Sequence, residues 1–60
     1  MKWRTWNTDY WILESPKGEV LDEITRDHEQ LFFLKSSQKR YTSLKAAQAE
    51  GKRNQENAPS

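Results

Sequence analysis

The side chains that could carry out chemistry are few in this chain, and they do not form the combinations that catalysis needs. His28 is the single histidine and cysteine is absent, so neither a Cys–His pair nor a thiolate metal site can be assembled. His28 lies between Asp27 and Glu29, a polar context typical of a solvated turn. The only glycines are Gly18 and Gly51, too few for a phosphate-binding loop. We therefore expect no catalytic residues, no enzymatic activity and no cofactor.

Three acidic residues, Asp22, Glu23 and Asp27, supply oxygen atoms of the kind that bind divalent cations. Their spacing does not match a calcium-binding loop. The pattern therefore favours a solvated strand edge, and we expect no metal site. A domain this small also offers little room for the concave pocket that small-molecule binding requires.

Aromatic side chains are the most informative group. The chain has three Trp, two Tyr and two Phe among 60 residues, and each large aromatic can bury roughly 150–250 Å². In the segment 10–13, Tyr10 and Ile12 alternate with Trp11 and Leu13, so apolar residues occupy both faces of one expected strand. A single helix covers one face. The other face is left for a protein partner or a second copy, unless sheet twist and the tail cover it within the chain. We expect the partner-binding residues to be Trp3, Trp6, Trp11, Phe32 and Phe33.

Charge is unevenly distributed along the chain. Residues 1–30 carry four basic and seven acidic side chains, whereas residues 31–60 carry six basic and two acidic ones. Basic groups near aromatic residues can contact phosphate and stack on single-stranded bases. The alternative function is therefore nucleic-acid binding, although a pI near 8.1 lies below the value of about 9 typical of such domains. The residues of this alternative, called here the basic set, are Lys35, Lys39, Arg40, Lys45, Lys52 and Arg53.

Strand formers dominate the first part of the chain. The segments 3–6, 10–13, 20–25 and 31–34 read as strands. Polar or Pro/Gly-containing turns are expected at 7–9, 15–18 and 26–29. Trp3 and Trp6 are an odd number of positions apart, so a straight strand would point them to opposite faces. Alternation also places Val20, Asp22 and Ile24 on one strand face.

A helix is expected after these strands, capped by Thr42 or Ser43 and ending at Gly51. Leu44 and Ala47 share the face that lies on the sheet. The predicted fold class is α+β: a three- to four-stranded antiparallel β-meander followed by one short C-terminal α-helix. The domain spans residues 1–50, and residues 51–60 form a frayed, disordered polar tail.

Size limits the stability of such a fold. A domain of 60 residues buries only about 60% of the surface that its unfolded chain exposes. A homodimer would bury the uncovered sheet face and add stability. No run of apolar residues is as long as that of a signal peptide or of a membrane-spanning helix. We therefore expect a cytoplasmic protein that does not bind membranes.

One local pattern resembles a known group of proteins. Its parts are Tyr10 to Leu13, the turn at Gly18, the strand to Ile24, Phe32-Phe33, and the segment Tyr41 to Glu50 with its aromatic–x–Ser–Leu–x–x–Ala motif. The pattern is similar to small uncharacterised bacteriophage and prophage accessory proteins with a β-meander and one C-terminal helix. That resemblance covers residues 2–50 and implies an accessory role in which the protein binds and modulates a host protein. A weaker likeness is to the arm-binding domain of phage integrases, whose basic sheet differs from the acidic segment 22–29 here.

Overall fold

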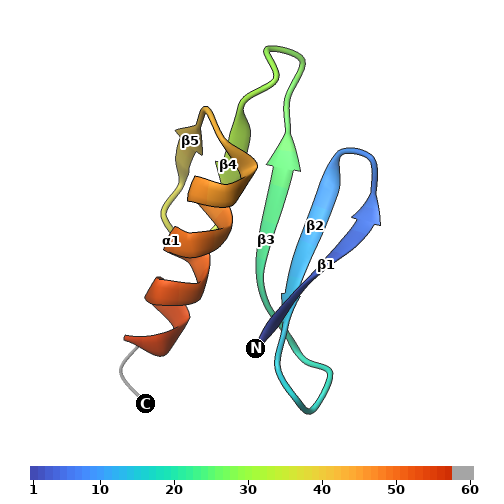
Figure 1. The fold of residues 1–60 in the computed structure, drawn as a ribbon, viewed down its shortest axis with the longest axis vertical. Coiled ribbons are helices and arrows are strands. Elements are labelled where there is room, and N and C mark those ends of the chain that lie inside the picture. The colour runs from blue at the N-terminus through green and yellow to red at the C-terminus, as the bar shows by residue number, and fades with distance from the viewer. Residues whose placement is uncertain (58–60) are drawn as a thin grey trace.

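A computed structural model describes residues 1–57 as one antiparallel sheet with a helix on one face (Figure 1). The strands follow one another in the sheet in chain order, and the helix closes the sequence. The predicted α+β class and the meander topology are confirmed, but the predicted number of strands is wrong because the sheet has five. The elements are β1 Lys2–Asn7, β2 Tyr10–Glu14, β3 Val20–Arg26, β4 Phe32–Leu34, β5 Lys39–Tyr41 and α1 Leu44–Glu56.

The strand that the sequence analysis missed is β5. It has only three residues, two of them basic, so it carries little strand signal of its own. The turn before it contains no glycine or asparagine, and Gln38 takes the positive φ of 55° that these residues usually supply. The Gln38 N–H donates to the Leu34 carbonyl at 2.8 Å, which closes the turn and pairs β4 with β5.

The predicted turns at the other strand junctions are confirmed. Asn7 accepts the N–H of Asp9 on its side-chain oxygen at 2.9 Å. Ser15 closes the second turn by accepting the N–H of Gly18, whose φ is 86°. In the third turn, the Asp27 carboxylate accepts backbone N–H groups from Glu29 and Leu31 at 2.9 and 3.0 Å. Short polar side chains, those of Asn7, Ser15 and Asp27, thus accept backbone N–H groups in these three turns.

Helix α1 begins as predicted but ends later. Ser43 is its N-cap and accepts the Ala46 N–H, and Ala47 on the predicted sheet-facing side is fully buried. The expectation that Gly51 ends the helix is wrong, since α1 runs through Gly51 to Glu56. Residues 51–56, expected to belong to the polar tail, are therefore helical, and 58–60 lie outside the described residues.

The reason for a glycine inside the helix is a close approach to the sheet. A Cβ atom at Gly51 would lie 2.8 Å from Trp3 Cζ2, 3.0 Å from Leu34 Cδ1 and 3.1 Å from Asp22 Oδ2. Such distances are shorter than van der Waals contact. The residue interpreted as a helix stop is therefore the point where α1 meets the core.

The core lies between the helix and the sheet. Trp11, Ile24, Leu34 and Ala47 form the buried cluster. Phe32 packs against it, with its ring at 63° to the Trp11 ring and 5.6 Å between centroids. The first strand also reaches the helix, because Trp3 Nε1 donates to the carbonyl of Gln48 at 2.9 Å.

Two β-bulges change which side chains face the helix. Between Thr5 and Asn7 the pairing of β1 with β2 shifts by one residue, and the extra residue is Trp6. In β3 the partners of Leu13 and Glu14 are Asp22 and Val20, so Leu21 is the extra residue. The second bulge overturns the expectation that Val20 shares a face with Asp22 and Ile24.

Candidate protein-binding face

The side of the sheet opposite α1, called here the open face, is not covered by any element of residues 1–57 (Figure 1). Cross-strand partners identify its members, because directly paired residues share a face. Its side chains are those of Lys2, Arg4, Trp6, Tyr10, Ile12, Glu14, Val20, Glu23, Thr25, Asp27, Phe33, Lys35 and Arg40.

An apolar hollow lies on the part of the open face formed by β1, β2 and the start of β3. Its lining residues are Trp6, Tyr10, Ile12 and Val20, and its volume is about 220 Å³. Trp6 is 64% exposed and Val20 53% exposed, whereas Ile12 at the base is only 5% exposed. We call this feature the Trp6 hollow. The bulge in β3 contributes to it by directing Val20 to this face, whereas Trp6 lies here by simple alternation from Trp3.

A polar network borders the hollow. The Tyr10 hydroxyl donates to Glu23, and Lys35 Nζ lies 3.2 Å from the other Glu23 carboxylate oxygen. The hydrogen bond from Tyr10 and the contact with Lys35 lower the pKa of Glu23 below its usual range. The same hydrogen bond, together with partial burial, raises the pKa of Tyr10. Both effects hold Tyr10 protonated and Glu23 ionised, which fixes the Tyr10 ring as one wall of the hollow.

Ion pairs within the chain neutralise most of the charge on the open face. Arg4 lies 2.9 Å from Glu14, and Arg40 in β5 lies 3.6 Å from Asp27 in the turn after β3. The pKa of Asp27 is lowered, first by the backbone N–H of Leu31 and further by Arg40. With the Lys35–Glu23 pair, three cations of this face are matched by three anions. The surface is therefore nearly neutral, with an apolar centre.

The five predicted partner-binding aromatics divide between the two sides of the sheet. Trp11 is 7% exposed and belongs to the core, while Trp3 and Phe32 pack against that core. Trp6 lines the hollow on the open face, and Phe33 lines a second hollow there with Thr25, Asp27 and Arg40. The opposite orientation of Trp3 and Trp6 is confirmed. Because Trp3, Trp11 and Phe32 lie on the helix side of the sheet, Trp6 and Phe33 are the members of the predicted set that lie on the open face.

Sequence reasoning did not place Tyr10, Ile12 or Val20 in the binding face. Tyr10 and Ile12 carried a usable signal, because they occupy the strand phase opposite to Trp11. The sequence pattern gave no indication that Val20 lies on this face, because its orientation depends on a β-bulge.

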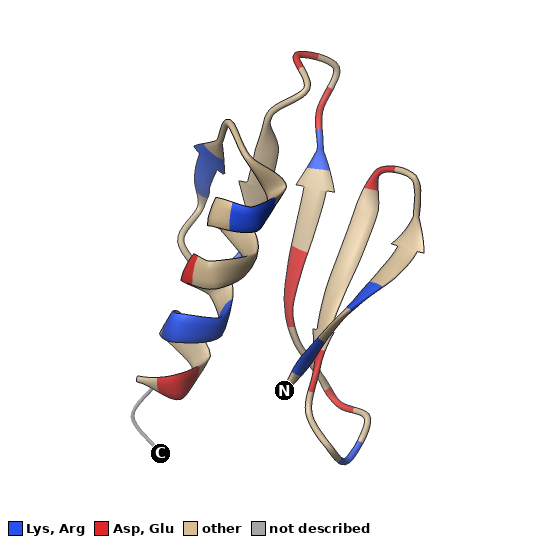
Figure 2. Ribbon diagram, in the orientation of Figure 1, with Lys and Arg blue, Asp and Glu red and all other residues tan. Residues whose placement is uncertain are grey.

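The basic set does not converge on one surface. Figure 2 shows its members spread over β5, the turn before it and α1. Lys35 and Arg40 lie on the open face, where each forms an ion pair. Lys39 alternates with Arg40 along β5 and therefore lies on the other side of the sheet. The helical members are Lys45, Lys52 and Arg53, all exposed. Because these cations are scattered and partly neutralised, they attract the phosphate backbone of a nucleic acid only weakly.

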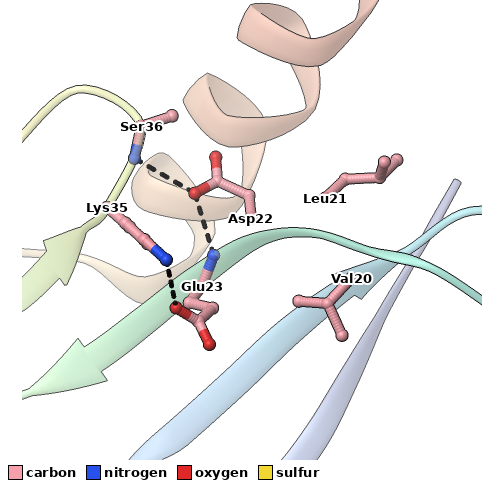
Figure 3. A pocket seen from close by; sticks show the side chains of 6 residues that line it. All are labelled: Val20, Leu21, Asp22, Glu23, Lys35 and Ser36. Carbon is pink, nitrogen blue, oxygen red and sulfur yellow. Dashed lines mark hydrogen bonds and ion pairs between the residues drawn. The ribbon is translucent and has the colours of Figure 1, made fainter.

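A more polar hollow of about 430 Å³ lies where β3 extends beyond β4 (Figure 3). Asp22 on its wall was expected to be solvated, but this prediction is wrong because the residue is only 2% exposed. Its Oδ1 accepts the N–H groups of Glu23 and Ser36 at 2.8 and 3.1 Å. Its Oδ2 is the one buried side-chain nitrogen or oxygen atom within residues 1–57 that has no hydrogen-bond partner, and it lies beneath Gly51. Asp22 thus joins the β4–β5 turn to β3 under the helix.

Comparisons with known proteins identify no relative. No protein-family model matches the chain, and neither a curated protein nor a solved structure matches it. Within residues 1–57, no group of three or more potential metal ligands comes together. None of the helical residues described here forms a segment long and apolar enough to cross a membrane.

Proposed function

We propose that this chain is a non-enzymatic protein-interaction module whose contact surface is the open face around the Trp6 hollow. The observation that carries the proposal is the exposure of Trp6 and Val20 beside a hollow of about 220 Å³. Trp and Tyr are the residues that most often supply binding energy at protein interfaces. The bacteriophage-type resemblance adds that the partner is a bacterial host protein met in the cytoplasm.

The size and chemistry of the hollow support a protein rather than a small molecule as partner. Small-molecule sites enclose about 300–1,000 Å³ and bury most of the ligand. The Trp6 hollow is smaller and open, so it suits a single large apolar side chain presented by another protein. Its polar border, formed by Tyr10, Glu23 and the Arg4–Glu14 pair, resembles the polar rim around the apolar centre of an interface.

The chemistry of the single histidine supports a non-enzymatic role. The His28 side chain is 92% exposed in the turn after β3, and the nearest carboxylate oxygen is 3.9 Å away on the neighbouring Glu29. General acid–base catalysis needs a group held in a site within hydrogen-bond reach of the reacting atom. His28 has no such setting among the described residues.

Affinity capture from bacterial lysate tests the proposal when it compares three baits: the natural chain, Trp6→Ser and Ala49→Ser. Ala49 is exposed on α1, away from the sheet, so its variant controls for handling and folding. We expect a protein retained by the natural chain and by Ala49→Ser but not by Trp6→Ser, because loss of an interface anchor weakens binding by about 2 kcal/mol or more. Identical retention by all three baits, or no retained protein, would contradict the proposal.

A further inference from the structure

We propose that in the free protein the open face is covered by a second copy of this chain, in a two-fold symmetric pair in which Trp6 of each copy lies against the Trp6 hollow of the other. The inference rests on the proposed function because it uses the same face. It goes further by naming what covers that face before a host protein displaces the second copy.

Shape is the first argument. A two-fold interface places the same patch of both copies in contact, so the patch must be complementary to itself. The open face meets this requirement, because a projecting side chain and a hollow lie side by side on it. Trp6, at 64% exposure, provides the projection and also lines the hollow with Tyr10, Ile12 and Val20. Each copy can therefore offer one aromatic ring and receive one.

Charge is the second argument. The Arg4–Glu14, Lys35–Glu23 and Arg40–Asp27 pairs neutralise six charged side chains of this face, leaving Lys2 at its margin. Two identical faces with a net charge would repel each other, and a nucleic acid would need unpaired cations. A nearly neutral surface with internal ion pairs can pack against a copy of itself without net electrostatic repulsion.

Area is the third argument. A standard stable interface buries about 800 Å² on each partner. The molecule measures 34 × 21 × 15 Å, so its broad side approaches this area. The total accessible surface is 4512 Å², and a pair formed by the sheet face would cover less than a fifth of it. The open face is thus large enough for a pair, and its apolar hollow is formed by side chains of β1, β2 and the start of β3.

Sedimentation equilibrium from low to high micromolar concentration tests the inference on four full-length chains: the natural chain, Trp6→Ser, Val20→Lys and Ala49→Lys. Val20→Lys adds a charge to the open face, and Ala49→Lys adds the same charge to the exposed side of α1. We expect the natural chain and Ala49→Lys to reach twice the monomer mass of 7.2 kDa. Trp6→Ser and Val20→Lys should weaken the pair at least tenfold, with circular dichroism confirming that each variant is folded.

Two results would overturn the inference. One is a natural chain that stays at 7.2 kDa throughout the concentration range. The other is a dimer that Trp6→Ser and Val20→Lys leave unchanged, because that dimer would use another surface. The capture experiment separates this failure from failure of the proposed function. A monomer that still captures a protein in a Trp6-dependent manner refutes the pair and supports the binding face, whereas capture independent of Trp6 refutes the binding face.

Discussion

Substitution of Gly51 by alanine tests the account of how α1 meets the sheet. Alanine in a helix interior is more favourable than glycine by about 1 kcal/mol, so helix propensity alone predicts a more stable protein. The structure predicts the opposite sign. The new Cβ would lie 2.8 Å from Trp3 Cζ2, 3.0 Å from Leu34 Cδ1 and 3.1 Å from Asp22 Oδ2.

The size of the effect follows from how little these neighbours can move. Leu34 is fully buried, Asp22 is 2% exposed and holds two backbone N–H groups, and the Trp3 ring is anchored to Gln48. Overpacking of a fixed core costs about 1–3 kcal/mol. We place Gly51→Ala near the upper end of that range, so after subtraction of the propensity gain the protein should lose about 1–2 kcal/mol. In a domain of this size, each kcal/mol corresponds to about 4–8 °C in Tm.

Urea denaturation followed by circular dichroism measures this loss. Ala49→Gly is the matched control, because it changes propensity in the same helix at an exposed position and should cost about 1 kcal/mol. Trp3→Leu provides a second check. It removes the ring that the new Cβ meets first, so Gly51→Ala should cost less in that background. A Gly51→Ala protein that is more stable than the natural chain by about the amount lost in Ala49→Gly would refute the reasoning.

Three further outcomes are expected. Trp3→Phe replaces the indole by a single aromatic ring, which removes the hydrogen bond to the Gln48 carbonyl and part of the packing against the core, so the free energy of unfolding should fall by at least about 1 kcal/mol in urea denaturation, and an unchanged midpoint would contradict the contact. The pKa of Glu23 is lowered from 4.5 on folding, so its contribution to stability is present above pH 4.5 and is lost as the pH falls through the folded-state value. Glu23→Gln should therefore make thermal stability less sensitive to pH on the acid side, and an identical pH profile would show that the Tyr10 and Lys35 contacts do not stabilise the ionised form. Because the basic set is scattered, mobility-shift titration should detect no tight binding to DNA or RNA, and a shift at low salt that disappears steeply as salt increases would favour the nucleic-acid alternative.

Local sequence signals predicted most of the fold. The strand-forming segments, the turn residues Ser15 and Asp27 and the cap at Ser43 lie where expected, because each depends on neighbouring residues in the chain. Gly51 was misread for the opposite reason. Its role depends on Trp3 and Leu34, which are distant in sequence, and no local pattern distinguishes a helix stop from a close approach.

The candidate site could be predicted only in part. The presence of apolar residues on both strand phases indicated an uncovered face, and Trp6 was among the residues assigned to it. The position of Val20 depends on the bulge at Leu21, and bulges carry no reliable sequence signal here. Asp22 was expected at a solvated edge, because its burial depends on the Ser36 N–H, which a turn 14 residues later supplies.

The bond from Trp3 to Gln48 joins the first strand to the last helix across 45 positions. During synthesis the sheet can begin to pair as its strands appear, but Leu34 and Trp11 have no helix over them until Ala47 has been added. The helix that completes the core is thus translated after every strand of the sheet. Folding should therefore be completed only after residues 47–51 are free to fold, and until then the partly formed sheet exposes apolar side chains on both faces, a state in which other proteins or chaperones can bind it.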